Sequence, residues 1–544
     1  MIVLNNCFFG KVFATRSVLC FLLLMMLMLS CILRTAVIAT GNYSEIQAQQ
    51  SAYRIQVAKL RGTIYDCNMV PFTNTDTKNI AAVSPTPKGI LKISSVLYGE
   101  QLETTLEALK NNKPAICTVD SDIQSEGIVT AKVYLHNPSH LSACHIIGYT
   151  DSSGHGVSGL ELAYDDFLYS DKGVSAVFTT DGTGGILAGV EPYFENDLSV
   201  VNQGVVTTLD INIQTIAETA TSLLQSGCAI VAEVGTGKIR ACASVPTFDI
   251  NNLSDSLNAE NSPYLNRALS AYSVGSVFKP CVAAAGIEAG YGNHTFMCEG
   301  NLEIVDRVFR CHNLSGHGNM NLCSALAQSC NCFFYNFAMT IGGERIYKMA
   351  SALNFGSKIR IAENLSTASG SIPQLKLLEN EGTLANLSIG QGDLLLSPLS
   401  MLTLYLAIAG DGSYYLPSVI EKTVKDGIEN YYDIGNPTRV MSAQTATTLR
   451  QYLETVVTEG TGIEAAPVSC TAAGKTATAQ TGRYYDNGEE ITNSWFCGFF
   501  PAQNPKYVTV IMSDSRSTVS TASVFAKIAD EIMQLKEYNV ENDD

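Results

Sequence analysis

Hydrophobic positions divide the chain into one long apolar run, a strand-rich middle and a C-terminal region of alternating strand and helix patterns. The run from Val18 to Leu33 carries no charged residue, and Arg16 and Arg34 flank it. The run is shorter than the roughly 20 residues that span a bilayer comfortably. The flanking basic side chains can extend to the membrane interface, however, and apolar residues before the run can lengthen the buried part. We therefore predict a membrane-spanning anchor at residues 18–40 after a short cytoplasmic segment at residues 1–17.

The charges around the apolar run predict its orientation. Lys11 and Arg16 precede it, which places the N-terminus inside the cell and the rest of the chain outside. The alternative is a cleaved signal peptide, because Val37-Ile38-Ala39 offers small residues to a signal peptidase. We favour the uncleaved anchor, and both alternatives export the body of the protein.

The two regions after the apolar run differ in pattern. Residues 41–203 mix short strands with loops, whereas the pattern of residues 204–544 is clearer. There the pattern predicts two β-hairpins (228–234 with 239–245, and 495–500 with 507–512), one more strand (472–480), and helices at 210–224 and 521–536.

A long, mostly helical insertion separates the two predicted hairpins. Strands at both ends of a domain, with helices first, last and between, indicate an α/β fold of the α+β type. We expect one antiparallel five-stranded sheet covered by helices on both faces, preceded by a mixed, strand-containing domain and one N-terminal transmembrane helix.

Composition narrows the class of protein. The chain has 544 residues, enough for two or three domains, and its 46% hydrophobic and 16% charged residues argue against disorder and against a coiled coil. Its formal net charge of −17 repels phosphate backbones. We therefore expect no nucleic-acid partner.

Sixteen cysteines in an exported chain raise the question of disulfides. They are scattered, and several lie inside apolar stretches, so we expect most to be buried thiols. Cys298, Cys311, His312, His317 and Cys323 lie close together in sequence but lack the tight Cys-x-x-Cys pair of a structural zinc site. We expect plain loop residues there, with a Cys298–Cys311 disulfide as the first alternative and zinc as the second.

Ser276 and Lys279 carry the first candidate chemistry. They stand at positions i and i+3 in Tyr272-Ser-Val-Gly-Ser-Val-Phe-Lys-Pro280, so a helix that begins at Ser276 places hydroxyl and amine on one face. A serine hydroxyl needs a base to act as a nucleophile, and a desolvated lysine can be that base. A chain this rich in serine produces about one such pair by chance, so the pair alone does not establish a site.

Two further motifs follow in order. Ser329 and Asn331 are two residues apart on a predicted loop, where a hydroxyl and an amide can face one cavity. Lys475 and Thr476 lie on the predicted strand at 472–480. A strand edge can bind an extended peptide, and these two side chains can hold its terminal carboxylate.

The three motifs together resemble those of the penicillin-binding protein and serine β-lactamase superfamily. The chain as a whole is similar to class B, monofunctional penicillin-binding proteins. Its further landmarks are Arg61–Asp66, Gly159–Tyr164, Thr207–Asp210, Ile389–Gly392 and Ser397–Leu399. The resemblance covers nearly the whole chain and implies a serine D,D-transpeptidase that cross-links cell-wall stem peptides on the outer side of the membrane. It also implies that residues 41–203 form a pedestal or dimerisation-like domain and residues 204–544 the penicillin-binding transpeptidase domain.

The resemblance also implies roles for single residues. Ser276 would be the acylated nucleophile and Lys279 its base or proton relay. Ser329 would pass the proton toward the leaving amine, and Asn331 would bind the substrate side chain.

The third motif departs from the family at one position. By resemblance Lys475 and Thr476 bind the terminal carboxylate, and the N–H groups of Ser276 and Thr478 form the oxyanion hole. The family motif usually reads Lys-Thr-Gly, whereas this chain has Ala477. Alanine adds a Cβ that narrows the space for backbone approach, but it is small enough for us to keep Ala477 among the substrate-binding residues.

The family implies ping-pong acyl transfer without a metal or organic cofactor. Stem peptides ending in D-Ala-D-Ala and β-lactams are the expected partners at the site, and a multi-spanning SEDS-type glycan polymerase is a family-level expectation. The alternatives are a D,D-carboxypeptidase or β-lactamase with the same site, or a non-catalytic β-lactam sensor or scaffold. A glycosyltransferase domain is disfavoured, since residues 41–202 contain no Glu-Asp-x-x-Phe stretch.

Overall fold

The computed structural model describes residues 3–40, 52–171, 173–181, 183–187, 189–196, 203–257, 259, 261–515 and 517–542. The chain begins with a helix, α1 (Val3–Thr40), which is longer than the predicted anchor at 18–40. Its stretch Ala14–Ala39 is 26 residues long with a mean hydropathy of 2.4, and among the described residues it is the one helix long and apolar enough to cross a membrane. The predicted domain start at residue 41 lies outside the described residues.

The chain forms two compact units. The first is built from residues 1–58, 78–133 and 173–197, and the second from residues 59–77, 134–172 and 198–544. The second unit thus takes segments from both sides of the boundary we placed between residues 203 and 204. The predicted domain boundary between residues 203 and 204 therefore stays a prediction.

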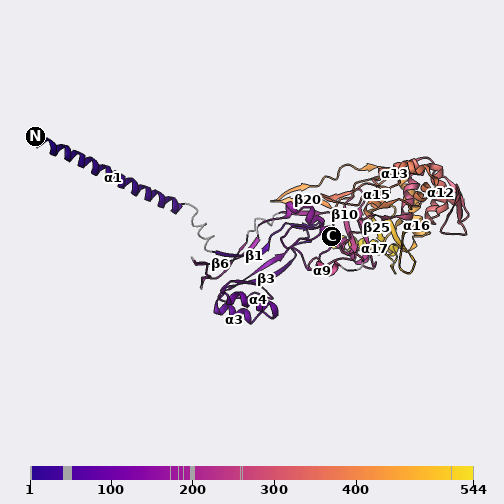
Figure 1. Cartoon of the computed structure of the whole chain (residues 1–544). Helices are drawn as coiled ribbons and strands as arrows, with labels where there is room; N and C mark the ends of the chain where they lie inside the picture. The colour runs from indigo at the N-terminus through magenta and orange to yellow at the C-terminus, as the bar shows by residue number, and fades with distance from the viewer. Residues whose placement is uncertain are drawn as a thin grey trace. The chain divides into compact units, whose positions relative to one another are not determined.

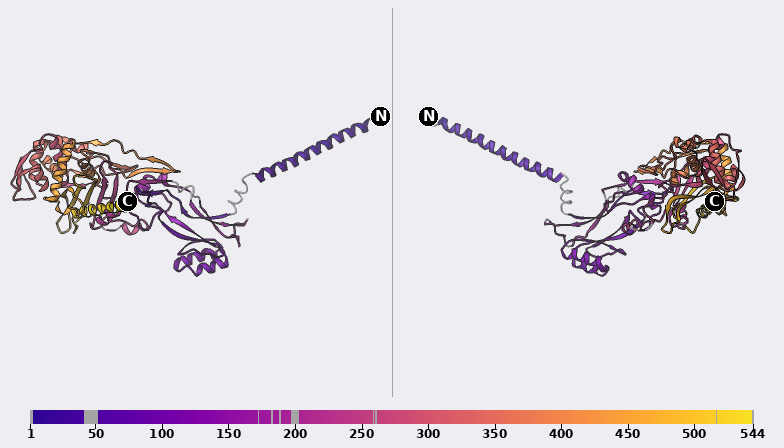
Figure 2. Two further views of the ribbon diagram at one scale, coloured as in Figure 1. Left: turned by 180° about the vertical axis from the view of Figure 1, so that it is seen from behind. Right: turned by 45° about the vertical axis from the view of Figure 1, so that its right-hand side comes forward.

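Besides α1, the described residues of the first unit form two small sheets and two helices. The sheets have the orders β1-β6-β7 and β4-β3-β5. The strands are β1 (Ala52–Lys59), β3 (Asp76–Val83), β4 (Ala115–Val119), β5 (Ile128–Leu135), β6 (Gly173–Thr179) and β7 (Tyr193–Asn196), and the helices are α3 (Pro87–Ser94) and α4 (Gly99–Lys110). The two helices lie side by side near β3 (Figure 1, Figure 2). Their apolar faces, with Ile93 and Leu109, share a core with Val83 and Cys117 of the β4-β3-β5 sheet.

The second unit is centred on one five-stranded antiparallel sheet, as the pattern predicted. Its strand order is β10-β9-β25-β24-β23. The strands are β9 (Gly227–Glu233), β10 (Ile239–Val245), β23 (Ala473–Tyr484), β24 (Glu490–Phe500) and β25 (Tyr507–Ser513). Each predicted hairpin forms, because a short turn joins two neighbouring strands whose side chains are mostly apolar on both faces of the sheet.

Helices cover both faces of this sheet, which confirms the predicted architecture. Ala229 and Val231 point to one face and pack against α8 (Ile211–Thr221) and α17 (Thr521–Asn542). Cys228 and Ile230 point to the other face, where α15 (Pro398–Ala409) packs. Asp210 caps α8 as expected, because its Oδ1 accepts the N–H of Asn212 at 2.9 Å.

The segment between the two hairpins was predicted to be mostly helical, but helices account for less than half of its residues, and loops and short strands make up the rest. Its helices lie together in one region (Figure 1). Its main helices are α10 (Lys279–Glu288), α11 (Leu322–Ala327), α12 (Asn331–Ile341), α13 (Gly343–Ala352), α14 (Glu381–Ser388), α15 and α16 (Ala443–Thr458). Several small strand pairs in this segment were not predicted, among them β12 (Thr295–Cys298) with β15 (Gly318–Asn321), and β13 (Asn301–Ile304) with β14 (Arg307–Arg310). These strands are short and largely exposed, so they show no clear alternation of apolar and polar residues.

A second, four-stranded sheet of the same unit has the order β2-β8-β20-β21. Its strands are β2 (Thr63–Tyr65), β8 (Gln203–Thr207), β20 (Ile420–Lys425) and β21 (Ile428–Tyr431). Three short helices, α5 (Cys144–Ile147), α6 (Gly159–Ala163) and α7 (Asp165–Leu168), belong to the same unit.

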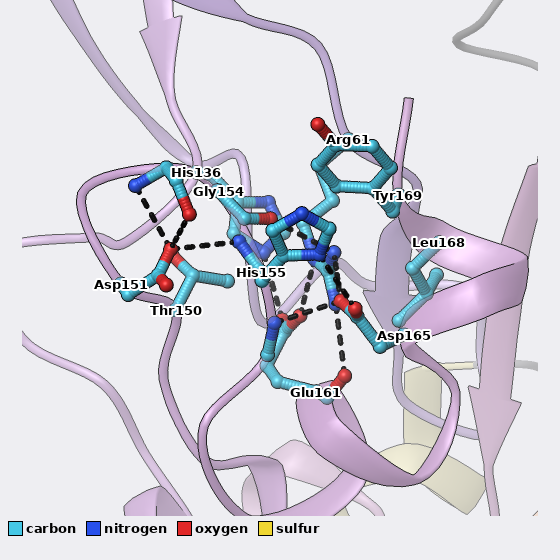
Figure 3. Close-up of polar contacts among 12 residues, drawn as sticks. Arg61, His136, Thr150, Asp151, Gly154, His155, Glu161, Asp165, Leu168 and Tyr169 are labelled. Atoms are coloured by element: carbon cyan, nitrogen blue, oxygen red, sulfur yellow. Dashed lines mark hydrogen bonds and ion pairs between the residues drawn. The ribbon is translucent and has the colours of Figure 1, made fainter. Parts of the chain in front are cut away.

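A buried ionic network joins two sequence landmarks of this unit (Figure 3). Arg61, just before β2, donates to Glu161 of α6 at 2.6 Å and to Asp165 of α7 at 2.7 Å. His136 Nε2 lies 2.7 Å from the other oxygen of Glu161, and His155 Nδ1 lies 2.8 Å from Asp165. Removal of one partner from such a buried ion pair costs about 3–5 kcal/mol, because the remaining charge stays buried and unpaired. The network therefore holds the segment after β1 to the α6–α7 region.

Candidate active site

The candidate nucleophile lies on a tight turn that leads into a buried helix. Ser276 belongs to a 3₁₀ helix, η2 (Gly275–Phe278), which continues directly into α10. Gly275 has φ +62 and donates its N–H to the carbonyl of Gly390 at 2.9 Å. A Cβ on Gly390 would lie 2.0 Å from the Gly275 carbonyl oxygen, so both positions of this contact require glycine.

Two aromatic side chains fix the nucleophile turn from opposite ends. Trp495 of β24 donates its Nε1–H to the carbonyl of Ser273 at 3.0 Å. Tyr405 of α15 donates its hydroxyl to the carbonyl of Val277 at 3.1 Å. The backbone on both sides of Ser276 is therefore held by the sheet and by the buried helix that covers it.

The Ser276 hydroxyl is open to a substrate. The residue is partly exposed, although its neighbours Gly275 and Val277 are buried. Across the described ranges no protein group hydrogen-bonds to its side chain. Its position in the first turn of a helix also surrounds it with unpaired backbone N–H groups, which favour a developing negative charge.

Lys279 is fully buried and meets the second predicted motif. Its Nζ donates to the carbonyl of Ser329 at 2.7 Å, to Oγ of Ser329 at 3.2 Å and to Oδ1 of Asn331 at 2.7 Å. Burial lowers the pKa of Lys279 to about 7. The structure thus brings three of the predicted site residues into one hydrogen-bonded group, with an amine that ionises near neutral pH.

The turn that carries Ser329 and Asn331 has an unusual backbone. Ser329 adopts a left-handed conformation with φ +53, which costs a non-glycine residue of order 1 kcal/mol or more. Cys330 follows as the N-cap of α12, and its Sγ accepts the N–H of Phe333 at 3.5 Å. Asn331 is the first residue of that helix. This geometry lets the side chains at 329 and 331 both reach Lys279.

The third predicted motif lies on β23, the last strand in the order of the five-stranded sheet. Lys475 and Ala477 face the buried side of this strand, and Thr476 and Thr478 face the more exposed side, as the alternation predicted. Lys475 is fully buried, and its Nζ donates to the carbonyl of Thr476 at 3.0 Å. Burial and the positive charge of Lys279 hold the pKa of Lys475 well below its usual range.

Ala477 faces the nucleophile turn. A Cβ built on Gly275 would lie 3.4 Å from the Ala477 Cβ and 3.1 Å from the Ala479 Cβ. The methyl group that distinguishes this chain from the usual Lys-Thr-Gly motif therefore packs against the backbone that carries Ser276.

Thr461 joins the site and was missed by our reading of the sequence. Its Oγ1 lies 2.9 Å from Oγ1 of Thr476 and 3.5 Å from Nζ of Lys475. Its N–H donates to the carbonyl of Ala327 at 3.0 Å, which anchors the turn after α16 beside α11. The sequence signal that could have indicated this turn is Gly460-Thr461-Gly462. The structure shows why glycine is needed there, because a Cβ at Gly460 would lie 2.4 Å from the carbonyl oxygen of Ala327.

The charges of the site favour an anionic ligand. Lys279 and Lys475 are both fully buried, and neither forms an ion pair with any acidic side chain that the structure describes. Desolvated cations without a carboxylate partner are costly unless a ligand supplies the negative charge. The outer edge of β23 also has no strand partner among the described residues, so an extended peptide can pair with it.

The cysteines near the site are free thiols. Of the residues that the structure describes, Cys298 and Cys311 are both buried and unbridged. The alternative disulfide between them is therefore wrong for this structure. The expectation of loop residues holds for Cys311, His312 and His317, but it is wrong for Cys298, which ends β12, and for Cys323, which lies in α11. His317 Nδ1 lies 3.6 Å from Cys298 Sγ and 3.5 Å from Cys311 Sγ.

The fold and the hydroxyl–lysine site are those expected of the penicillin-recognising class of proteins, and comparison with known proteins agrees. The penicillin binding protein transpeptidase domain matches residues 227–534. The chain therefore belongs to the penicillin-binding protein transpeptidase family.

Curated relatives cover most of the chain. Penicillin-binding protein PbpB of Mycobacterium tuberculosis is 32% identical in an alignment 427 residues long that covers 73% of this chain and 61% of that protein. Stage V sporulation protein D of Bacillus subtilis is 29% identical in an alignment 424 residues long that covers 73% of this chain and 63% of that protein. The chain thus spans less than two thirds of the length of both relatives.

A solved structure shares the fold. Penicillin binding protein 3 from Mycobacterium tuberculosis, complexed with ampicillin, superposes with a TM-score of 0.64 at 25% identity. The match covers 89% of this chain and 96% of that one. The resemblance that the motifs indicated is confirmed at the level of family and fold.

Proposed function

We propose that this protein is a peptidoglycan D,D-transpeptidase that works through an acyl-enzyme on Ser276. The observation that carries this proposal is the free Ser276 hydroxyl on a turn beside two buried lysines that have no acidic partner among the described residues. Family membership and the homologues named penicillin-binding proteins support it.

The first half-reaction is acyl transfer to the serine. Ser276 Oγ attacks the carbonyl carbon between the two terminal D-alanines, and its proton passes to the neutral Nζ of Lys279. Burial makes that neutral form available near pH 7. The N–H groups of Ser276 and Thr478 stabilise the negative charge on the carbonyl oxygen. The C–N bond then breaks, and Ser329 relays the proton from Lys279 to the departing D-alanine amine.

The second half-reaction uses the same groups in reverse. An amine from a neighbouring stem peptide attacks the ester, gives its proton through Ser329 to Lys279, and leaves the serine hydroxyl restored. A β-lactam acylates Ser276 in the same way, but its ring-opened leaving group stays attached, so the acyl-enzyme persists.

Binding of the donor peptide involves the remaining predicted residues. Lys475, Thr476 and the newly found Thr461 would hold the terminal carboxylate, and their mutual contacts support this role. Asn331 would bind the substrate side chain, and its bond to Lys279 would also orient that amine. Ala477 packs behind the nucleophile and shapes the site without contacting the carboxylate.

The cellular setting follows from the N-terminal helix. We place α1 across the cytoplasmic membrane as a single-pass anchor, with both compact units on the outer side. Residues 41–203 would form the pedestal and residues 204–544 the transpeptidase domain. A SEDS-type glycan polymerase as partner rests on the family resemblance alone.

The test measures acyl transfer directly. The full-length chain in detergent is incubated with a donor peptide that ends in D-Ala-D-Ala and with an amine acceptor. Aminolysed product that depends on Ser276 is the expected result, and the Ser276→Ala variant is the control. Hydrolysis without aminolysis would indicate a carboxypeptidase, and rapid turnover of a chromogenic cephalosporin a β-lactamase. Acylation by penicillin without turnover of any peptide would indicate a sensor or scaffold.

A further inference from the structure

Four side chains with metal-binding atoms converge beside the active-site turn. The Sγ atoms of Cys298, Cys311 and Cys330 and one ring nitrogen of His317 all lie within 4.8 Å of one another. We propose that these four residues bind one zinc ion, which fixes the turn carrying Ser329 and Asn331.

The distances between these atoms match a tetrahedral zinc site. Zinc–sulfur bonds of about 2.3 Å and zinc–nitrogen bonds of about 2.0–2.1 Å imply sulfur–sulfur edges of about 3.8 Å and sulfur–nitrogen edges of about 3.5 Å. His317 Nδ1 lies 3.6 Å from Cys298 Sγ and 3.5 Å from Cys311 Sγ. The sulfurs of Cys311 and Cys330 are 4.0 Å apart. This last distance is about twice a disulfide bond.

The chemistry of the donor set selects the metal. Three thiolates and one imidazole are a common set for closed, structural zinc sites, because the ion accepts soft sulfur and nitrogen ligands in tetrahedral geometry and has no redox chemistry. All three cysteines are almost fully buried and His317 is half-buried. With all four ligands supplied by the protein, no position is left for water, so the ion would have a structural role.

Neighbouring side chains do not belong to the set. His312 is exposed, and its Nδ1 lies 3.9 Å from Cys311 Sγ. Cys323, which the sequence placed in the same group, instead approaches Oγ1 of Thr455 at 3.8 Å. Both residues therefore serve as matched controls for their nearby ligand counterparts.

Two backbone segments approach each other closely beside the four residues. Cys298 ends β12, and His317 directly precedes β15, the partner of β12. Gly300 and Gly316 both have positive φ. A Cβ on Gly300 would lie 2.1 Å from the Leu314 carbonyl oxygen, and one on Gly316 would lie 2.3 Å from the Cys298 carbonyl oxygen. This close approach of two backbone segments sets the distance between the first and third ligands.

Cys330 connects the metal site to catalysis. It stands between Ser329 and Asn331, both of which bond to Lys279. Of the other three ligands, Cys298 ends β12, Cys311 directly follows β14, and His317 directly precedes β15. A metal ion would tie this peripheral segment to the turn, and would thereby hold Ser329 in its left-handed conformation.

The first experiment counts the metal. The full-length chain is purified in detergent under reducing conditions, and its metal content is measured by inductively coupled plasma mass spectrometry. We expect one zinc ion per chain. Replacement by cobalt should give the intense visible bands of a tetrahedral ion together with sulfur-to-cobalt charge-transfer absorption, a signature that general stabilisation of the fold cannot produce.

Variants then test the ligand set. Changes outside the ligand shell already lower zinc affinity by about 10–100-fold, so we expect Cys311→Ser to lower it by more than about 100-fold. His317→Gln removes the half-buried ligand and is the variant least disruptive to the core. Cys323→Ser and His312→Gln should keep full zinc content and the cobalt spectrum of the unchanged chain.

Function gives a third readout that depends on the position of Cys330. Removal of zinc by a chelator should slow penicillin acylation by about tenfold or more, and added zinc should restore the rate.

Several results would overturn the proposal: a metal-free chain that binds no added zinc, iron in place of zinc, a disulfide among the three cysteines in the reduced preparation, or full zinc content in the Cys311→Ser and His317→Gln variants. Acylation that is indifferent to zinc would refute its effect on the turn.

Discussion

Lys279 Nζ lies 2.7 Å from Oδ1 of Asn331, although 52 positions separate the two residues. The contact joins the nucleophile helix to the turn before α12 inside a fully buried environment. Oxygen acceptors surround the amine, but no described acidic group pairs with it. These hydrogen bonds hold the amine in place, and its burial destabilises the charged form. A general base that works at neutral pH requires an amine that can be neutral there.

The pH dependence of acylation tests this relationship. Burial lowers the pKa of Lys279 to about 7, far below the roughly 10.4 of a free lysine. The neutral amine accepts the proton, so the rate constant for penicillin acylation should rise as pH increases through about 7 and then level off. Lys279→Arg keeps the positive charge at all accessible pH values and should abolish acylation. A rate that rises only with a group of pKa near 10 would contradict the assignment.

Thr461 should contribute to the recognition of the carboxylate. Thr461→Val removes the hydroxyl that contacts Thr476 and Lys475, and a hydrogen bond to a charged group is worth about 1.5–3 kcal/mol. We expect the second-order acylation rate constant to fall by about tenfold or more, and Thr461→Ser to retain most of it. Thr458→Val, which removes an exposed hydroxyl bonded only to the carbonyl of Glu454, is the control and should have no effect. An unchanged rate for Thr461→Val would remove Thr461 from the site.

Ala477 should tolerate a smaller residue but not a larger one. Its methyl packs against the backbone of Gly275, so Ala477→Gly should change the acylation rate by less than about tenfold, equivalent to 1.4 kcal/mol. Ala477→Leu should overpack the same contact, displace Ser276 and slow acylation strongly. Gln480→Leu, on the exposed face of β23, is the control. Second-order acylation rates decide the matter, and a harmless leucine at 477 would show that the strand is not packed as described.

The N-terminal helix should remain on the mature protein. Its apolar stretch Ala14–Ala39 continues past Arg34 without a helix break. Mass spectrometry of the protein from the membrane fraction should therefore detect peptides from before the apolar stretch. A soluble protein whose N-terminus lies near Thr40 would show instead that the helix is a cleaved signal peptide.

The sheet and its covering helices were predictable because each is encoded locally. The continuous apolar run at residues 228–232 and the capping side chain of Asp210 both act within a few residues, and the strand and the helix cap both appear in the structure as expected. The same holds for β23, where Lys475 and Ala477 face one side because side chains alternate along any strand.

The rest of the site depends on contacts between distant residues, which local pattern does not encode. Cys330 was interpreted only as the middle of the Ser329–Asn331 motif, and its approach to Cys311 appears only once α12 packs near the small strand pairs. Thr461 reaches Thr476 because the turn after α16 packs on Ala327. The low pKa values of the two lysines also follow from burial that only the folded chain creates.

The covalent position of penicillin tests the central claim most directly. The full-length chain is treated with penicillin, digested, and analysed by tandem mass spectrometry, with Ser276→Ala as the control. The account predicts one adduct, on the Ser276 hydroxyl in the peptide that contains Lys279, and no adduct in the variant. An adduct on another residue, or labelling that survives Ser276→Ala, would contradict it.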